Sequence, residues 1–443
     1  MIFKYIKYQL LTLFILGGSH VFSQANLDYN QLKLSEAIEI GLQNNKKLKI
    51  RSLQTEIAEL HERDLLNDKL PDVNFHTSFY KLSTLRQFEH GILNRSTQYD
   101  VPGEQYDFTL SAEIPIYLGG KLKNDEKKAA IEVDIKKLQV RKDERELRME
   151  IITAYLKVLH LKEQQLLIED KMHEDTLVIK QTKALKKNGA VTYNEVLRTE
   201  LQLSNHKISH SELSKEIDIL EHHVKTILAI HPEHEVHIDT SDLITSTDHI
   251  GLVDDMILEA LGNSEKLKIS EKDVRLKEID KKITRANILP KITAGGKYGY
   301  TYPNFMFFPP EEFMYRFGMV GVNVSIPISN FFKNKQKMQI ANQNISIAKL
   351  EVEEREEEII HDVFVANKRL EDAIEKIEIA KEAINQSKEN YRIVKTKYIN
   401  KLSLITELID ADNSLLEAQS NMISLQINKQ LKYYQLQYVL GNL

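Results

Sequence analysis

The chain has 443 residues, of which 28% are charged and 42% are hydrophobic. This mixture, with only 16 Gly and 9 Pro, is typical of long solvated helices that carry a narrow apolar stripe. The sequence has no Cys, which excludes disulfides, thiolate metal sites and a lipid anchor on an N-terminal Cys. The net charge of −5 comes without a Lys/Arg cluster, so nucleic acid is not expected as a partner.

The N-terminus has the pattern of an export signal. Two Lys residues precede a short apolar run at 10–16, and the small residues Val21 and Ser23 suit the −3 and −1 positions of a cleavage site. We therefore expect residues 1–23 to be a signal peptide. The alternative is a membrane anchor, which the shortness of the apolar run disfavours. No later window offers about 18 apolar residues in succession, so a mature chain that enters a membrane must do so as strands.

The sequence contains an internal repeat. Lys-Leu-Lys-Ile at 47–50 recurs 219 residues later at 266–269, and Leu70-Pro71 recurs at the same distance. Ile-Pro-Ile at 114–116 recurs 212 residues later, because the loop between these landmarks is seven residues shorter in the second copy. Recurrence in a fixed order indicates two copies of one structural unit. We expect a first repeat over 24–231, a linker over 232–251 and a second repeat over 252–443.

Each repeat is expected to end in a long helical stretch. All nine Pro lie outside 116–231 and 328–443, and Pro breaks helices. Apolar residues spaced four, three and four apart place one stripe on one helix face in each run, as in a coiled coil. The stripes are Leu147, Ile151, Ala154 and Val158 in the first repeat, and Ile359, Val363, Ala366 and Leu370 in the second.

A shorter helix is expected to open each repeat. In the first repeat it begins at Ser35, as the N-cap, and runs to about Lys69. In the second repeat it runs from about Leu252 to Ile288. Leu-Pro follows both helices, and the residue before Pro is pushed out of the α region.

Beyond Leu-Pro the hydrophobic period changes from that of a helix to that of a strand. Alternation of apolar with polar residues is clearest over 105–114. It recurs in three other segments, at 73–79, 292–302 and 320–326. Each repeat therefore predicts one β-hairpin, at about 72–116 and about 291–328, with strands of roughly ten residues, the length of a membrane strand.

Aromatic residues gather in and near the loop of the second hairpin. At the end of membrane strands such residues form an interfacial girdle, and the alternative is a loop that packs on its own rings. The residues concerned are Phe305, Phe307, Phe308, Phe313, Tyr315 and Phe317.

Four strands cannot close a barrel by themselves. An open sheet in lipid would leave backbone groups unpaired, each at a cost of several kcal/mol, and membrane barrels start at about eight strands. The strands therefore form either a soluble sheet or one part of a barrel that several chains share. The export signal and the alternation favour the shared barrel.

With these features the chain resembles the TolC-like outer-membrane efflux proteins over essentially all of its mature length. The resemblance rests on the two repeats, Leu-Pro before each hairpin, Ile-Pro-Ile after it, and a turn motif halfway along each Pro-free run. The family motif reads roughly Gly-Leu and then Thr-Asp-Val-Leu. It corresponds here to Gly-Ala-Val-Thr-Tyr-Asn-Glu-Val-Leu at 189–197 and to Lys-Leu-Ser-Leu-Ile-Thr-Glu-Leu-Ile at 401–409.

The resemblance implies a mainly α fold with a membrane β-barrel portion. Two tandem helix–β-hairpin–helix repeats per chain would form a twelve-stranded barrel and a twelve-helix tunnel as a homotrimer. Helical tips at about 188–194 and 400–406 would dock a periplasmic adaptor (membrane fusion protein) that is linked to an inner-membrane RND or ABC transporter. The tip residues are Asn188, Gly189, Ala190, Asn194, Glu195, Lys401, Leu402, Thr406 and Glu407.

The turn motif also has a physical explanation. Gly189 suits the left-handed conformation that ends a helix. Asn194 or Thr406 can cap the helix that follows, with Glu195 or Glu407 favourable in its first turn.

The resemblance further implies a gate near the tips, where acidic rings constrict the tunnel. Asn385, Gln386 and Glu389 lie two to four turns before the second tip, and only Glu389 is acidic. Gln386 and Glu389 are therefore the gate candidates.

Catalytic sites and metal sites are the other two classes of site on which the sequence offers evidence. The sequence has no Gly-rich phosphate loop, nucleophile elbow or zinc-protease motif, so neither an enzyme nor a bound cofactor is expected. His206 and His210 lie four residues apart, a spacing that can chelate a metal, and five further His lie within 222–237. The second interpretation of the 222–237 cluster is a solvated linker between the repeats.

The sequence as a whole predicts an outer-membrane channel subunit that extends into the periplasm and forms a passive exit duct for efflux or secretion. Two alternatives remain open. One is a soluble periplasmic coiled-coil scaffold or adaptor without a pore, and the other is a metal-binding periplasmic protein.

Overall fold

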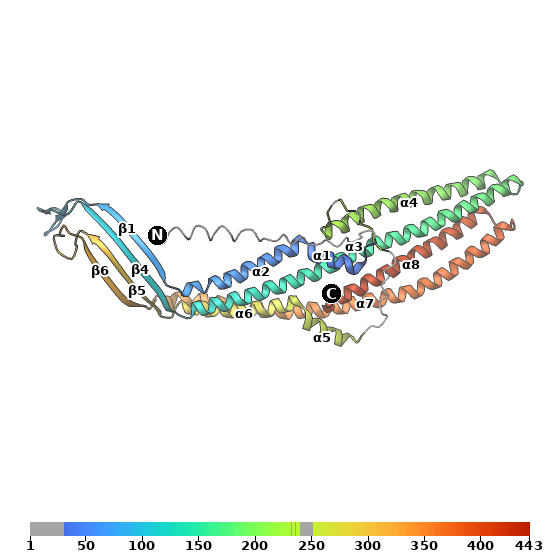
Figure 1. The fold of residues 1–443 in the computed structure, drawn as a ribbon. Coiled ribbons are helices and arrows are strands. Elements are labelled where there is room, and N and C mark those ends of the chain that lie inside the picture. The colour runs from blue at the N-terminus through green and yellow to red at the C-terminus, as the bar shows by residue number, and fades with distance from the viewer. Residues whose placement is uncertain (1–30, 232, 235, 240–250) are drawn as a thin grey trace, which may run out of the picture.

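The computed structural model describes residues 31–231, 233–234, 236–239 and 251–443. The molecule is elongated, with a four-stranded sheet at one end and two helical tips at the other (Figure 1). The expected signal peptide and most of the expected linker lie outside the described residues. Within the described ranges, every helix is too short or too polar to be a membrane span.

The sheet contains one hairpin from each repeat. The first repeat contributes β1 (Asp72–Lys81) and β4 (Glu104–Leu118), and the second contributes β5 (Lys291–Tyr302) and β6 (Tyr315–Ser325). All neighbours are antiparallel, in the order β1-β4-β5-β6. Among the described residues, the outer edges of β1 and β6 are therefore unpaired.

The strand register separates an apolar face of the sheet from a polar one. Phe75 lies opposite Leu110, and Leu110 lies opposite Tyr298. Asn74 and Ser111 are paired in the same way on the other face. The predicted alternation is confirmed in this register. The apolar face is exposed, because no described part of the chain covers it.

The first hairpin differs from its predicted form in two places. β4 continues through Pro115 to Leu118, whereas the hairpin was expected to end at 116. A register shift between Pro115 and Tyr117 accommodates a residue that has no backbone N–H to donate. Two short strands that the sequence did not predict, β2 (Leu85–Gln87) and β3 (Thr97–Tyr99), pair within the loop.

Two long helices carry the chain away from the sheet. α3 (Lys121–Lys187) and α7 (Asn330–Ile399) have 67 and 70 residues, each about 100 Å of helix. Each turns back at a tip into a shorter helix, α4 (Tyr193–Ile227) or α8 (Ile405–Leu440). The helices begin later than Ile116 and Ile328, where the Pro-free runs start.

The helices form a layer whose order follows the order of the strands. Near the sheet, α2 (Lys46–Asp64) packs on α3, α3 on α6 (Glu265–Ala286), and α6 on α7. Toward the tips, the order is α4, α3, α8 and α7 (Figure 1). The layer is thus four helices wide throughout, with α2 and α4 along one edge and α7 along the other.

The single helix that was expected to open each repeat is broken into two. In the first repeat α1 (Leu34–Asn44) precedes α2, and in the second α5 (Val253–Asn263) precedes α6. The breaks fall at Asn45 and Ser264, which are 219 residues apart and correspond in the repeat.

Both break residues cap the helix that follows. The Asn45 side chain accepts a hydrogen bond from the Lys47 backbone N–H at 2.8 Å. Ser264 accepts one from the Leu267 N–H at 3.2 Å. The expectation that Ser35 caps the first helix is wrong, because the helix begins at Leu34, one residue before it.

The two predicted coiled-coil stripes are confirmed as buried and form the main cores. The first stripe packs with α1 and α4, and the second with α5 and α8. Both cores lie in the middle of the molecule, between the sheet and the tips.

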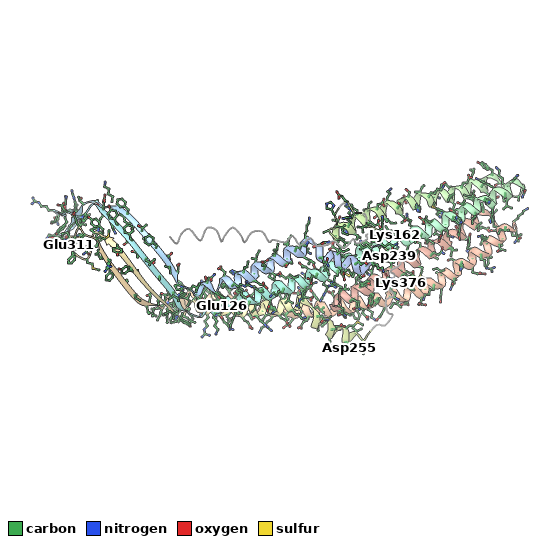
Figure 2. All side chains as sticks on the ribbon, viewed as in Figure 1. Glu126, Lys162, Asp239, Asp255, Glu311 and Lys376 are labelled. Atoms are coloured by element: carbon green, nitrogen blue, oxygen red, sulfur yellow. The ribbon has the colours of Figure 1, made fainter. Side chains whose placement is uncertain are left out.

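Part of the described linker is packed: Val236 and Ile238 are buried, whereas Glu233, His234 and His237 are exposed, as expected of a solvated linker. Ile238 forms a parallel bridge with Leu32, and the Leu32 N–H donates to the His237 carbonyl at 2.9 Å. The Lys162 ammonium donates to the Ile238 carbonyl at 3.1 Å, and Figure 2 shows Lys162 near Asp239 at mid-length. Val236 and Ile238 are buried in the first core, which corrects the expectation for these residues.

Candidate functional site

The first tip joins α3 to α4. Gly189 has φ 69°, and the N–H groups of Gly189 and Ala190 donate to the carbonyls of Lys186 and Leu185 at 2.9 Å each. This pair of bonds satisfies the last carbonyls of α3. The left-handed conformation predicted for Gly189 is confirmed.

The second tip has the same backbone geometry without a Gly. Lys401 has φ 64°, and the N–H groups of Lys401 and Leu402 donate to the carbonyls of Tyr398 and Lys397 at 2.9 and 2.8 Å. A residue with a β-carbon pays about 1–2 kcal/mol in this conformation. The tips therefore match in shape although their sequences differ.

Neither Asn194 nor Thr406 caps its helix, contrary to the sequence prediction. Thr192 is the N-cap of α4, and its backbone N–H donates to the Glu195 carboxylate at 3.3 Å. Leu404 precedes α8 and makes no capping bond. Both helices begin one residue before the predicted caps, which places Asn194 and Thr406 in the first turn.

The two tips are joined to each other. The Tyr398 hydroxyl, at the end of α7, donates to Glu195, at the start of α4, at 3.3 Å. Tyr398 is buried with Ile405 and Leu408 in a small apolar cluster that also contacts Leu185 of α3. The predicted tip residues therefore lie on one end surface of the molecule.

The two tips expose different kinds of side chain on this end surface. At the second tip Leu402 and Leu404 are 76% and 67% exposed. At the first tip Ala190 is half-buried, and the Lys186 ammonium lies 4.1 Å from the centre of the exposed Tyr193 ring. The second tip is thus mainly apolar, whereas the first is mainly polar and cationic.

The gate candidates lie on α7, some turns before the tip. Glu389 accepts two hydrogen bonds from the Arg392 guanidinium, at 2.8 and 2.7 Å. These bonds hold the pKa of the Glu389 carboxyl below its usual value. Gln386 is exposed. In one copy the single acidic candidate is therefore already paired with a base from its own helix.

A buried polar layer, which the sequence did not reveal, joins the two helical hairpins. The Lys171 ammonium of α3 is 2.8 Å from the Asp412 carboxylate of α8 and 2.7 Å from Glu174. The ring centre of Tyr391, on α7, is 5.4 Å away. Burial alone would lower the pKa of Lys171, but its hydrogen bonds to both carboxylates raise the pKa above the usual value. Lys171 is therefore charged at neutral pH.

His206 and His210, whose spacing could allow metal chelation, each contact a different carboxylate. The Nδ1 atom of His206 lies 2.7 Å from Asp175, and both side chains are buried. The Nε2 atom of His210 lies 2.8 Å from Glu169. In the 222–237 cluster, His237 contacts Glu221 at 3.1 Å. Among the described residues, no three His, Asp or Glu side chains converge as metal ligands.

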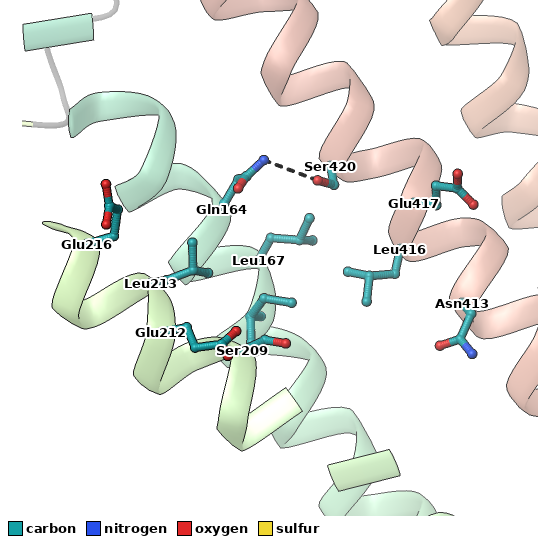
Figure 3. Close-up of a pocket in the computed structure, with 11 residues that line it drawn as sticks. Gln164, Leu167, Ser209, Glu212, Leu213, Glu216, Asn413, Leu416, Glu417 and Ser420 are labelled. Carbon is teal, nitrogen blue, oxygen red and sulfur yellow. Dashed lines mark hydrogen bonds between the residues drawn. The ribbon is translucent and has the colours of Figure 1, made fainter. Parts of the chain in front are cut away.

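A groove of about 650 Å³ opens among α3, α4 and α8 (Figure 3). The Gln164 amide donates to the Ser420 hydroxyl at 3.3 Å across it. Its labelled lining combines apolar side chains, Leu167, Leu213 and Leu416, with the carboxylates of Glu212, Glu216 and Glu417.

An amphipathic four-stranded sheet, continued by a helical layer about 100 Å long that ends in two tips, is the architecture of outer-membrane channel subunits. The chain belongs to the outer membrane efflux protein family, which it matches over residues 42–229 and 256–442. No curated protein sequence matches the chain.

Solved structures of outer-membrane channels have the same fold. VceC from Vibrio cholerae is 16% identical with a TM-score of 0.74, over 92% of this chain and 96% of that one. MtrE from Neisseria gonorrhoeae is 17% identical with a TM-score of 0.72, over 92% and 88%. CmeC from Campylobacter jejuni is 14% identical with a TM-score of 0.74, over 92% and 85%.

The protein is therefore a subunit of a passive exit duct for efflux, and it is not an enzyme. It resides in the outer membrane and extends into the periplasm. Channels of this family work with partner adaptors and inner-membrane pumps. Family membership excludes the alternative of a scaffold without a pore.

The pair of Lys171 and Asp412, buried between the two helical hairpins, leads to a testable prediction. Asp412→Ala should lower the free energy of unfolding by about 1–3 kcal/mol, because the buried Lys171 ammonium then keeps only the Glu174 carboxylate as a partner. Replacing both residues (Lys171→Met with Asp412→Leu) should recover most of this loss. Thermal unfolding followed by circular dichroism measures both effects. As a control, Asp372→Ala breaks an exposed pair with Lys376 and should cost less than about 1 kcal/mol.

The pH dependence of the same pair has a definite sign. Because the pKa of Lys171 is raised in the folded state, the stability it contributes is complete below about pH 10.4. That stability is lost only as the pH rises through the raised pKa. A difference between wild type and the double variant that changed between pH 6 and 8 would contradict this assignment.

Proposed function

We propose that three copies close into a ring, with a twelve-stranded barrel in the outer membrane and a twelve-helix tunnel in the periplasm. One observation carries the proposal: the sheet and the helical layer both end in unpartnered edges on both sides. β1 and β6 each lack one neighbouring strand within the described ranges, and the helices joined to them form the edges of the layer. The number three rests on the family resemblance.

Exposed apolar stripes on both edges of the layer support ring closure. On α2 the residues are spaced three, four and three apart, which places them on one face, and on α7 a similar set occupies the part nearer the sheet. Apolar surface of this extent marks a protein contact. The exposed residues are Ile50, Leu53, Ile57 and Leu60 on α2, and Ile340, Ile347 and Leu350 on α7.

In the ring the apolar face of the sheet contacts outer-membrane lipid and the polar face lines a water-filled lumen. Phe75, Leu110 and Tyr298 would meet lipid, while Asn74 and Ser111 would meet water. The channel supplies no energy, and the partner pump drives transport.

A charge placed on the α2 edge tests ring closure. Ile57→Asp should abolish the heat-sensitive trimer on semi-native gels, because the carboxylate would be buried between copies. Leu166→Asp is the matched control. Leu166 is also an exposed apolar residue, but it lies on α3, which is not at an edge of the layer. A wild-type protein with the mass of a monomer in detergent, by light scattering, would refute the trimer.

We further propose that the tips dock the helical hairpin of a periplasmic adaptor, which connects the duct to an RND or ABC pump. The contact residues are those of both turns and of the first turns of α4 and α8. The exposed Leu402 and Leu404 support an apolar anchor at the second tip. The polar first tip would then set orientation more than affinity.

The difference between the tips is measurable. Leu402→Ser should weaken binding of the purified adaptor at least tenfold, whereas Ala190→Ser should change it less than threefold, because Leu402 offers far more apolar surface. Biolayer interferometry on immobilised trimer gives the two affinities. Equal binding by wild type and Leu402→Ser, with the trimer intact in both, would remove the anchor role.

Gln386 and Glu389 are proposed to line the tunnel near its periplasmic end. Because Glu389 and Arg392 form a pair, each neutralises the other's field. Arg392→Ala should therefore raise cation selectivity and Glu389→Ala should lower it, as seen in the reversal potential of a planar bilayer under a KCl gradient. Gln386→Ala, which changes no charge, is the control. Identical reversal potentials for all three variants would place the pair outside the ion path.

A further inference from the structure

The loop between β5 and β6, residues 303–314 and here called the aromatic loop, exposes four consecutive apolar side chains. Phe305, Met306, Phe307 and Phe308 are 46%, 62%, 55% and 64% exposed. These exposures contradict, at these positions, the alternative in which the loop buries its own aromatic rings. An exposed apolar run of this length in a folded protein indicates a contact surface.

The aromatic loop is held in a defined shape. The Asn304 N–H donates to the Glu311 carbonyl at 3.0 Å, and the Glu311 N–H donates back to the Asn304 carbonyl at 3.2 Å. The Asn304 side chain is buried and accepts from the Met306 N–H at 3.0 Å. These bonds fix the backbone on both sides of the apolar run, so a partner would bind it with little ordering cost.

The loop of the first hairpin, residues 82–103 and here called the first loop, also exposes apolar side chains. Ile92 and Leu93, between β2 and β3, are 83% and 97% exposed. The two loops already meet within one copy, because the Tyr99 ring makes an edge contact with the Phe308 ring at 5.1 Å between centres. Ile92 and Leu93 of the first loop, and Phe305, Met306 and Phe307 of the aromatic loop, remain exposed.

Strand order indicates where that partner would come from. In the proposed ring, β6 lies beside β1 of the next copy. Neighbouring strands are about 4.8 Å apart, so adjacent hairpins are separated by about 10 Å. The aromatic loop is then flanked at equal spacing by the first loop of its own chain and by that of the next copy. A contact like that between Tyr99 and Phe308 is therefore within reach across the boundary.

The two loops differ in net charge. The aromatic loop carries Glu311 and Glu312 and no base, and Figure 2 shows Glu311 at the outer end of the sheet. In the first loop Arg95 lies two residues from Leu93 and is exposed. Arg95, Glu311 and Glu312 take part in none of the ion pairs found among the described residues. The first loop also carries Arg86, Glu89 and Asp100 and is neutral overall. The two acids of the aromatic loop therefore disfavour contact with anionic lipid, and Arg95 offers them a base on a neighbouring protein surface.

We propose that the aromatic loop of each copy packs on Ile92 and Leu93 of the next copy, with Arg95 facing Glu311 and Glu312. The three contacts form an apolar collar that ties the copies together at the outer end of the barrel, far from the helical interfaces. This inference rests on the proposed ring, and its test separates the two.

Disulfide trapping tests the collar cleanly, because the chain has no Cys. In outer membranes oxidised with copper phenanthroline, Leu93→Cys with Phe307→Cys should yield covalent dimers and trimers. Leu93→Cys with Phe332→Cys is the control, since Phe332 lies beyond the opposite end of β6 and should not cross-link to the loop. Cross-links confined to single chains, or none at all, with the heat-sensitive trimer intact would overturn the collar and leave the ring standing. Absence of the trimer in wild type would instead overturn the ring.

A fluorescence experiment distinguishes the collar from insertion of the loop into lipid, because the chain also has no Trp. Phe307→Trp, reconstituted in vesicles of brominated phosphatidylcholine, should be quenched less than one third as strongly as Val322→Trp on the apolar sheet face. Equal quenching of the two variants would place the loop in the bilayer and overturn the collar.

Discussion

The backbone groups along the outer edges of β1 and β6 have no strand partner in the part of the chain that the structure describes, and the rest of the architecture follows from that constraint. In hydrocarbon each unpaired group costs several kcal/mol, so the sheet is stable in the outer membrane only when both edges are covered. Each strand is joined to a helix of the layer. In the proposed ring, the closure that pairs β6 with β1 therefore also brings α7 against α2 and α4. One requirement of the backbone thus couples the membrane portion to the periplasmic portion.

The helical layer is stabilised differently at mid-length and closer to the tips. At mid-length the stripes of α3 and α7 pack in apolar cores with α1 and α5. Closer to the tips the hairpins meet through Lys171 and Asp412, with Asp175 and His206 buried nearby. Buried polar pairs contribute less stability than apolar contacts, but they specify alignment, because a shifted pairing leaves a charge unpaired. The buried charge pair therefore adds alignment specificity to the apolar cluster around Tyr398 that joins the tips.

The two repeats share a backbone plan and differ in chemistry. Asn45 and Ser264 break the opening helices at equivalent positions, and Gly189 and Lys401 have the same left-handed conformation. The Tyr155 hydroxyl lies within hydrogen-bond distance of carbonyl oxygens of Leu32 and Asp239, whereas the equivalent Asn367 donates to Glu371 on its own helix. The linker residues that the structure describes thus pack on the first repeat. Differences of this kind allow a pseudo-symmetric chain to present two unlike tips.

The sequence by itself determined the two repeats, the four strands with their two faces, and the buried stripes, because each of these leaves a local periodic pattern. The N-caps predicted at Ser35, Asn194 and Thr406 each lie two residues beyond the observed ones, Lys33, Thr192 and Leu404. Lys and Leu are not favoured capping residues, so residue type could not locate two of these starts. Only the tertiary structure revealed the packed linker residues and the Lys171–Asp412 pair. Those partners are 241 residues apart, and no local pattern encodes a contact that exists only after two hairpins have packed together.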